Sequence, residues 1–124
     1  MFGLFSLFGR TTALDSALRA SGIHPVLVPD AVKLTIIRMH KRDREALRAE
    51  PAYADTAELL AYCMLGDASF IESNSSLAAD RAEARIEAAI AAGDSADAKL
   101  ILLALHSGLI DAEIADRFDF GDSS

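Results

Sequence analysis

Hydrophobic residues recur along this chain with the spacing of helices, and one stretch is apolar on every side. In residues 94–108, the six positions after Lys99 are all Leu, Ile or Ala. At 100° per residue these side chains point in every direction, so a helix here must be covered all round. The stretch is too short to span a bilayer, which needs about 20 apolar residues. The pattern predicts that residues 95–107 form the buried central helix of an all-α bundle.

Capping residues and prolines divide the first half of the chain. Thr11 or Thr12 is expected to cap a helix that ends near residue 21, where Gly22 follows. The two prolines in residues 24–29 disfavour helix at the residues before them, so this segment should be extended. Asp30 should then cap a helix over residues 30–49.

The second half contains similar signals. Asp55 starts a predicted helix to residue 65, and the polar run over 67–76 is typical of a loop. Ser75 or Ser76 should cap a helix to residue 92, whose buried face would hold Ala79, Ala82, Ile86, Ala89 and Ile90. The short link at Gly93 predicts an antiparallel hairpin with the central helix. Asp111 should cap a short last helix, followed by a tail over 119–124.

These elements amount to one helical domain of five or six helices over residues 1–124. The length fits a single core. An apolar N-terminal segment, residues 1–9, precedes the predicted helices, and it carries three of the six Phe residues. Its large apolar residues are Phe2, Leu4, Phe5, Leu7 and Phe8.

Three roles are open for this N-terminal segment. It can pack on its own core, form part of an interface with a second subunit, or lie in a membrane interface. Helices of the last kind usually carry several Lys or Arg residues, and this one has only Arg10. A signal peptide would place the positive charge before the apolar run, which is not the order here. We therefore treat the five apolar residues as candidate interface residues.

Composition narrows the function classes. The chain is 52% hydrophobic, which suggests that some apolar surface is buried between subunits. A net charge of −7 argues against nucleic acid as a partner. Cys63 is the only cysteine, so the chain has no internal disulfide and a cytoplasmic location is expected. Few Lys and a single Asn indicate a GC-rich bacterial genome.

Catalytic and metal-binding motifs are missing from the sequence. It has no Gly-rich phosphate loop, paired-cysteine motif or His-Glu-x-x-His, so we expect neither a metal nor a cofactor. The three histidines, His24, His40 and His106, lie on different elements, and each is expected to have a structural or surface role. Cys63 lies in an apolar helix and should be an inert core thiol. Residues 108–118 resemble part of a helix-turn-helix, but their acidic side chains would repel DNA.

The predicted helix over 30–49 carries half of all basic residues. Residues 31–49 hold six basic and two acidic residues, so they carry a charge of +4 and the remainder carries −11. The candidate anion-binding residues are Arg38, Lys41, Arg44 and Arg48. The alternative is a set of cations that pair with the protein's own acidic helices. Asp43 falls in the apolar stripe of the same helix, where an unpaired carboxylate would be costly.

The sequence predicts a non-enzymatic protein-interaction module that self-associates. The alternative is a binding protein for a small anion at the basic helix, and an enzyme comes third because no acid, base or nucleophile is fixed beside another. No family resemblance guides this choice.

Overall fold

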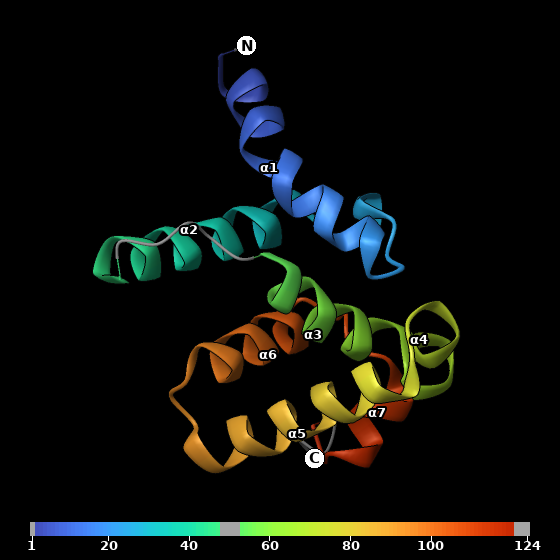
Figure 1. Cartoon of the computed structure of the whole chain (residues 1–124). Helices are drawn as coiled ribbons and strands as arrows, with labels where there is room; N and C mark the ends of the chain where they lie inside the picture. The colour runs from blue at the N-terminus through green and yellow to red at the C-terminus, as the bar shows by residue number, and fades with distance from the viewer. Residues whose placement is uncertain (1, 48–52, 121–124) are drawn as a thin grey trace.

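A computed structural model describes residues 2–47 and 53–120, with the backbone alone for residues 2–10 and 42–47. These residues form α-helices and one short 3-10 helix, without a strand (Figure 1). The all-α prediction is therefore confirmed, with seven α-helices in place of the expected five or six. The elements are α1 (Phe2–Ala20), η1 (Pro25–Leu27), α2 (Asp30–Leu47), α3 (Tyr53–Leu65), α4 (Asp67–Ser73), α5 (Ser76–Ala92), α6 (Ala96–His106) and α7 (Ala112–Arg117).

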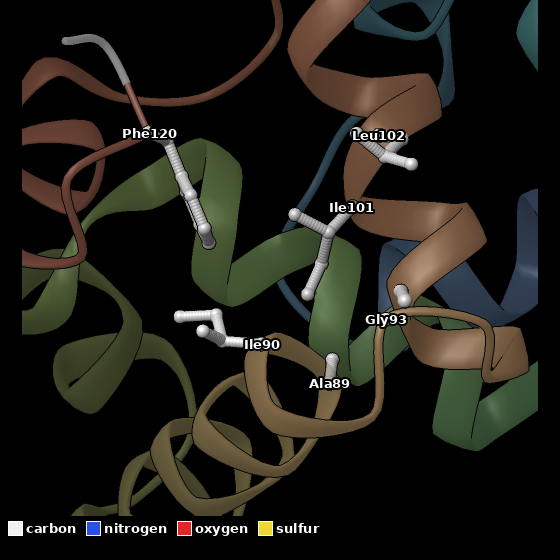
Figure 2. Close-up of a pocket in the computed structure, with 7 residues that line it drawn as sticks. Ala89, Ile90, Gly93, Ile101, Leu102 and Phe120 are labelled. Atoms are coloured by element: carbon white, nitrogen blue, oxygen red, sulfur yellow. The ribbon is translucent and has the colours of Figure 1, made fainter.

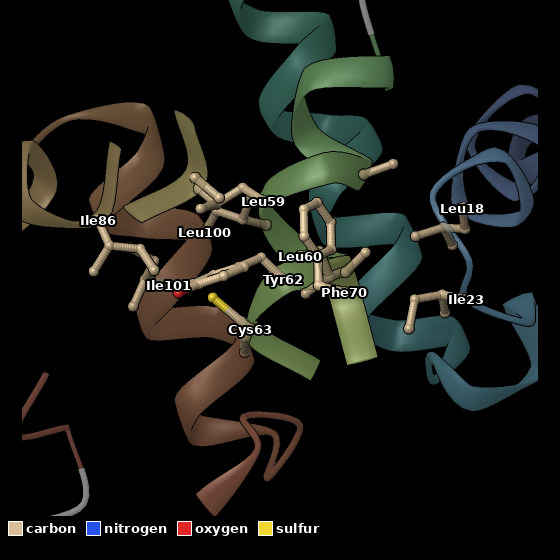
Figure 3. Packing of buried hydrophobic residues seen from close by; sticks show 14 of the residues in the cluster. Leu18, Ile23, Leu59, Leu60, Tyr62, Cys63, Phe70, Ile86, Leu100 and Ile101 are labelled. Atoms are coloured by element: carbon tan, nitrogen blue, oxygen red, sulfur yellow. The ribbon is translucent and has the colours of Figure 1, made fainter. Parts of the chain in front are cut away.

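Helix α3 lies in the middle of the bundle, the position that the sequence predicted for the helix over residues 95–107. It packs against α1 on one side and against α5 and α6 on the other (Figure 1). Figure 3 shows this sandwich: Leu18 lies on the α1 side of the core and Ile101 on the α6 side, with Leu60 between them. The buried residues of α3 lie on every side of the helix, and they are Ala57, Leu59, Leu60, Ala61, Tyr62 and Cys63. Coverage from several directions explains why no side of its second half is polar.

Helix α6 matches its expected bounds but has one exposed side. Leu100 and Ile101 are buried, whereas Leu102 is 49% exposed. Leu103 and Leu105 are half-buried. The expectation that all these leucines are covered is therefore wrong for Leu102. The physical reason is that α6 lies at the outside of the bundle, so its neighbours α2, α3 and α5 cover only part of its circumference.

Local capping signals position several helix ends as expected. The Ser75 hydroxyl accepts a hydrogen bond from the Ala78 amide at the start of α5. The Ser95 hydroxyl, which was not among the predicted caps, accepts a hydrogen bond from the Ala98 amide at the start of α6. Gly93 ends α5 with φ 79, a left-handed conformation that favours glycine. The two helices form the predicted antiparallel hairpin (Figure 1).

Two helix boundaries differ from the expectation. Helix α1 runs without a break from Phe2, so Thr11 and Thr12 lie inside it and do not cap it. No proline interrupts residues 2–20, which lets the helix continue through both threonines. Residues 67–73 form α4 where a loop was expected, because Phe70 is fully buried and packs edge-on against Tyr62.

The segment between α1 and α2 contains one short turn. His24 and Val28 are extended, as expected, but the residues between them form η1. The His24 ring nitrogen Nδ1 accepts a hydrogen bond from the Val26 amide, so this histidine has a structural role. Pro25 and Val28 are buried and attach the crossover to the core.

A buried hydroxyl connects α7 to the centre of the bundle. The Tyr62 hydroxyl donates to Asp67 Oδ1 at 3.0 Å and accepts from Arg117 Nη1 at 2.8 Å. Burial, and then the hydrogen bond to Asp67, raise the pKa of Tyr62 above its ordinary value. Arg117 thereby joins α7 to α3 and α4.

Candidate functional site

The strongest candidate site is an apolar pocket between α5 and α6 (Figure 2). Its volume is about 160 Å³. The residues that line it are Ala89, Ile90, Gly93, Ala98, Ile101, Leu102 and Phe120. We call this site the hairpin pocket.

Small residues create the space within the hairpin. Ala89 on α5 and Ala98 on α6 are nearly buried, and their short side chains leave a gap between the two helices. Gly93 contributes no side chain at the turn, and nothing within 4 Å would meet a Cβ there. Ile101 forms the buried wall of the pocket. The hairpin pocket therefore results from an alternation of small and large residues at the helix crossing.

Phe120 forms the wall opposite Ile101 and Leu102 (Figure 2). A tight turn after α7 brings it there: Asp119 has φ 64, and the Phe120 amide donates to the Ala115 carbonyl at 2.7 Å. Phe118 and Phe120 stack with ring centroids 5.9 Å apart. The prediction of a tail beginning at residue 119 is therefore wrong for Phe120, which is half-buried against the core.

Two large apolar side chains are exposed at the edge of the hairpin pocket. Ile90 is 53% exposed and Leu102 is 49% exposed, and they come from the two different helices of the hairpin. The placement of Ile90 on the buried face of its helix is therefore wrong. Single exposed apolar side chains are ordinary, but Ile90 and Leu102 flank an apolar pocket and extend its apolar surface.

The side chains that line the hairpin pocket are all apolar. None of its lining residues titrates or offers a polar side chain. Pockets for small metabolites usually carry a few polar groups that fix the orientation of the ligand. An apolar cavity of about 150 Å³ can hold a benzene-sized group. The hairpin pocket is therefore suited to one aromatic or branched aliphatic side chain.

A second cavity lies between α2, α3 and α6, and it is much smaller. Its volume is about 30 Å³, which is room for a single water. His40 and Thr56 line this cavity, and a hydrogen bond joins His40 Nε2 to Thr56 Oγ1. The pair thus places an imidazole base next to a hydroxyl group. Asp97, which also lines it, is held by two hydrogen bonds from Arg85. The space admits no substrate, so we assign this group a role in packing α2 against α3 and α6.

Among the predicted anion-binding residues, two have described side chains. Arg38 and Lys41 are exposed on α2, and neither forms an ion pair within the described part of the chain. Neither lines either of the two cavities. Arg44 belongs to the backbone-only end of α2, as does Asp43, and Arg48 lies outside the described residues. Of the four candidates, the described side chains are therefore Arg38 and Lys41, which lie one helical turn apart on α2.

The remaining basic and polar candidates have structural surroundings. Lys33 is buried, and its Nζ lies 3.0 Å from Asp15 Oδ1 on α1, so one cation of the basic helix does pair with an acidic residue of another helix. His106 is exposed at the end of α6. Cys63 is buried, which raises the pKa of its thiol to about 12 and keeps it protonated at neutral pH.

The side chains of the candidate interface residues Phe2, Leu4, Phe5, Leu7 and Phe8 lie outside the description, although α1 includes their backbone. Among the described residues, no group of three His, Cys, Asp or Glu side chains could hold a metal ion. None of the described helices is both long and apolar enough to cross a membrane.

Sequence reasoning missed the hairpin pocket as a whole. A usable signal was present in the small residues Ala89, Gly93 and Ala98 beside large ones at the hairpin turn. Comparison of the chain with protein-family models, curated proteins and solved structures gives no match. The function must therefore be argued from the geometry.

Proposed function

We propose that the protein is a non-enzymatic interaction module that self-associates through the surface around the hairpin pocket. The observation that carries this proposal is the apolar pocket flanked by the exposed side chains of Ile90 and Leu102. Interfaces are commonly organised around one or two apolar anchors that fill a pocket on the partner. A pocket of about 160 Å³ has the size of such an anchor.

The absence of polar lining separates this proposal from a small-molecule site. A metabolite in the hairpin pocket would find no hydrogen-bonding side chain among the lining residues. A partner protein needs none there, because its polar contacts can lie at the rim. Glu87, Asp94 and Lys99 are exposed and lie within a few residues of the lining residues in sequence. The arrangement therefore fits an apolar anchor surrounded by charged contacts.

Self-association is tested by measuring mass across a range of concentrations with sedimentation or light scattering. We expect the wild-type chain to form a larger species at high micromolar concentration. Leu102→Lys should return it to a monomer, because a charge at the pocket edge cannot be buried there without a partner. Leu77→Lys is the matched control, since Leu77 is 67% exposed at the opposite end of α5.

The control variant should associate like wild type. A wild-type chain that stays monomeric at hundreds of micromolar would contradict the proposal. Equal effects of Leu102→Lys and Leu77→Lys would also contradict it, since they would show a general response to added charge.

The second candidate function is binding of a small anion on α2. It is favoured by the exposure of Arg38 and Lys41, which lie one helical turn apart and have no ion-pair partner among the described residues. Their charges are thus available to a phosphate or carboxylate. This candidate is weaker because no described cavity adjoins them.

A further inference from the structure

We propose that the hairpin pocket of one copy receives the apolar N-terminal segment, residues 2–8, of a second copy. This inference rests on the proposed self-association and names the two surfaces that meet. The segment would bind as part of α1, so recognition is of a helix by a pocket.

The chain's own phenylalanines point to this occupant. The pocket has room for one aromatic ring, and residues 2–8 contain Phe2, Phe5 and Phe8. The other three phenylalanines already have packing partners: Phe70 is fully buried, and Phe118 and Phe120 stack on each other. The N-terminal segment concentrates half of the chain's phenylalanines within seven residues.

The arrangement of helices requires the segment to come from another molecule. Helix α1 packs on α2 and α3, and its first half extends away from the rest of the bundle (Figure 1). The α5–α6 hairpin lies on the far side of α3 (Figure 1). A rigid helix cannot turn back around α3 to its own pocket. Two copies can each offer a segment and a pocket, so reciprocal exchange would close a dimer.

Charge also favours this pairing. The N-terminal segment has no acidic residue, and the first one in the chain is Asp15. Arg10 lies just after the segment. Glu87, Asp94 and Asp119 are exposed and lie within three residues of a lining residue in sequence. The exposed basic residues within the same distance are Lys99 and Arg117, and Arg117 is already paired with Asp67. A basic residue next to an apolar helix complements an acidic rim around an apolar pocket.

Disulfide trapping between separately purified full-length variants tests the contact. Phe5→Cys and Phe8→Cys supply a thiol on the segment, and Leu102→Cys supplies one at the pocket. The native Cys63 is buried and should not react. After mixing under mild oxidation, we expect a mixed disulfide between a segment variant and Leu102→Cys. Leu77→Cys, which is at least as exposed but far from the pocket, should form at least tenfold less.

A second full-length variant tests the same contact without oxidation. Phe5→Ser with Phe8→Ser should lower the associated fraction at a given concentration at least tenfold, with an unchanged circular dichroism spectrum. A synthetic peptide with the sequence of residues 1–12 should compete with wild-type association, and its Ser-substituted version should not.

The outcomes separate this inference from the function on which it rests. If Leu102→Lys gives a monomer but the Phe5/Phe8 double variant still associates, the pocket mediates self-association and the N-terminal segment is the wrong occupant. If neither change affects the mass, the proposed function itself is wrong. If the double variant abolishes only flotation with anionic liposomes, the segment binds membranes and the inference is overturned. Equal trapping at positions 77 and 102 would also overturn it.

Discussion

Filling the hairpin pocket from inside should stabilise the chain and prevent its association. Ala98 lines the pocket and is 7% exposed, so Ala98→Leu would direct three additional carbon atoms into a space of about 160 Å³. The added group is half the size of a benzene ring, which a cavity of this volume accommodates. The variant occupies the pocket without altering its exposed edge.

The size of the effect follows from the area that the new side chain buries. Each fully buried methylene contributes about 0.8 kcal/mol, so three would contribute about 2.4 kcal/mol. The pocket is open between Ile90 and Leu102, so we take roughly half of that value. Ordering a leucine side chain costs about 0.5–1 kcal/mol. The net gain in unfolding free energy should be about 0.5 kcal/mol, with an upper limit near 1.5 kcal/mol if the side chain closes the opening.

The assay combines urea unfolding with mass measurement. Unfolding is measured at the lowest usable concentration, because association adds its own stabilisation. Mass is measured at high concentration, where Ala98→Leu should remain monomeric. Ala84→Leu is the control: Ala84 is exposed on the same hairpin, so the substitution should change neither quantity.

Two results would refute the reasoning about the pocket. Destabilisation of Ala98→Leu by more than about 1 kcal/mol would indicate overpacking, and the space between the helices would then not be available. Stabilisation with unchanged association would show that the space exists but is not used by a partner.

Three further predictions concern the core, the thiol and the basic helix. Leu60→Ala should lower the unfolding free energy by about 2–5 kcal/mol, because Leu60 is 1% exposed. Leu102→Ala, measured at low protein concentration, should lower it by about 1 kcal/mol. Similar losses for the two variants in urea unfolding would mean that the core is misplaced. Cys63 should resist Ellman's reagent at pH 8 until the chain is unfolded, and since burial raises its pKa from 9.0 to about 12, stability should fall as pH rises through that interval. If α2 binds anions, millimolar phosphate should raise the melting temperature more than chloride of equal ionic strength does. The double variant Arg38→Ala with Lys41→Ala should remove this difference. Equal shifts of the wild-type melting temperature in the two salts would indicate screening only.

Helix caps and helix ends, which depend on a few adjacent residues, could be predicted from the sequence. Ser75, Ser95 and Asp111 each accept a hydrogen bond from a nearby backbone amide, and this requires only a short polar side chain before a helix. Gly93 ends its helix for a similarly local reason. The helical content and the α5–α6 hairpin follow from such signals.

Features that depend on distant neighbours could not be read in this way. The apolar run of α6 does not reveal which leucine lacks a neighbour, because coverage depends on where α2, α3 and α5 pack. The pairing of Lys33 with Asp15 joins two helices whose crossing is a tertiary result. Phe120 reaches the candidate site because Asp119 adopts a left-handed backbone conformation. The sequence gives no signal for this conformation, since the residue is not glycine. The candidate site was therefore the least predictable part.

The turn at Asp119 gives one exposed position indirect control over the hairpin pocket. A residue other than glycine in the left-handed region costs roughly 1–2 kcal/mol, and aspartate tolerates it better than most. A β-branched residue at position 119 would disfavour the left-handed conformation, so Phe120 would move away from the pocket. Glycine would adopt this conformation with less strain and keep Phe120 in place. A substitution at position 119 would thus change the shape of the hairpin pocket while leaving the identity of every lining residue unchanged.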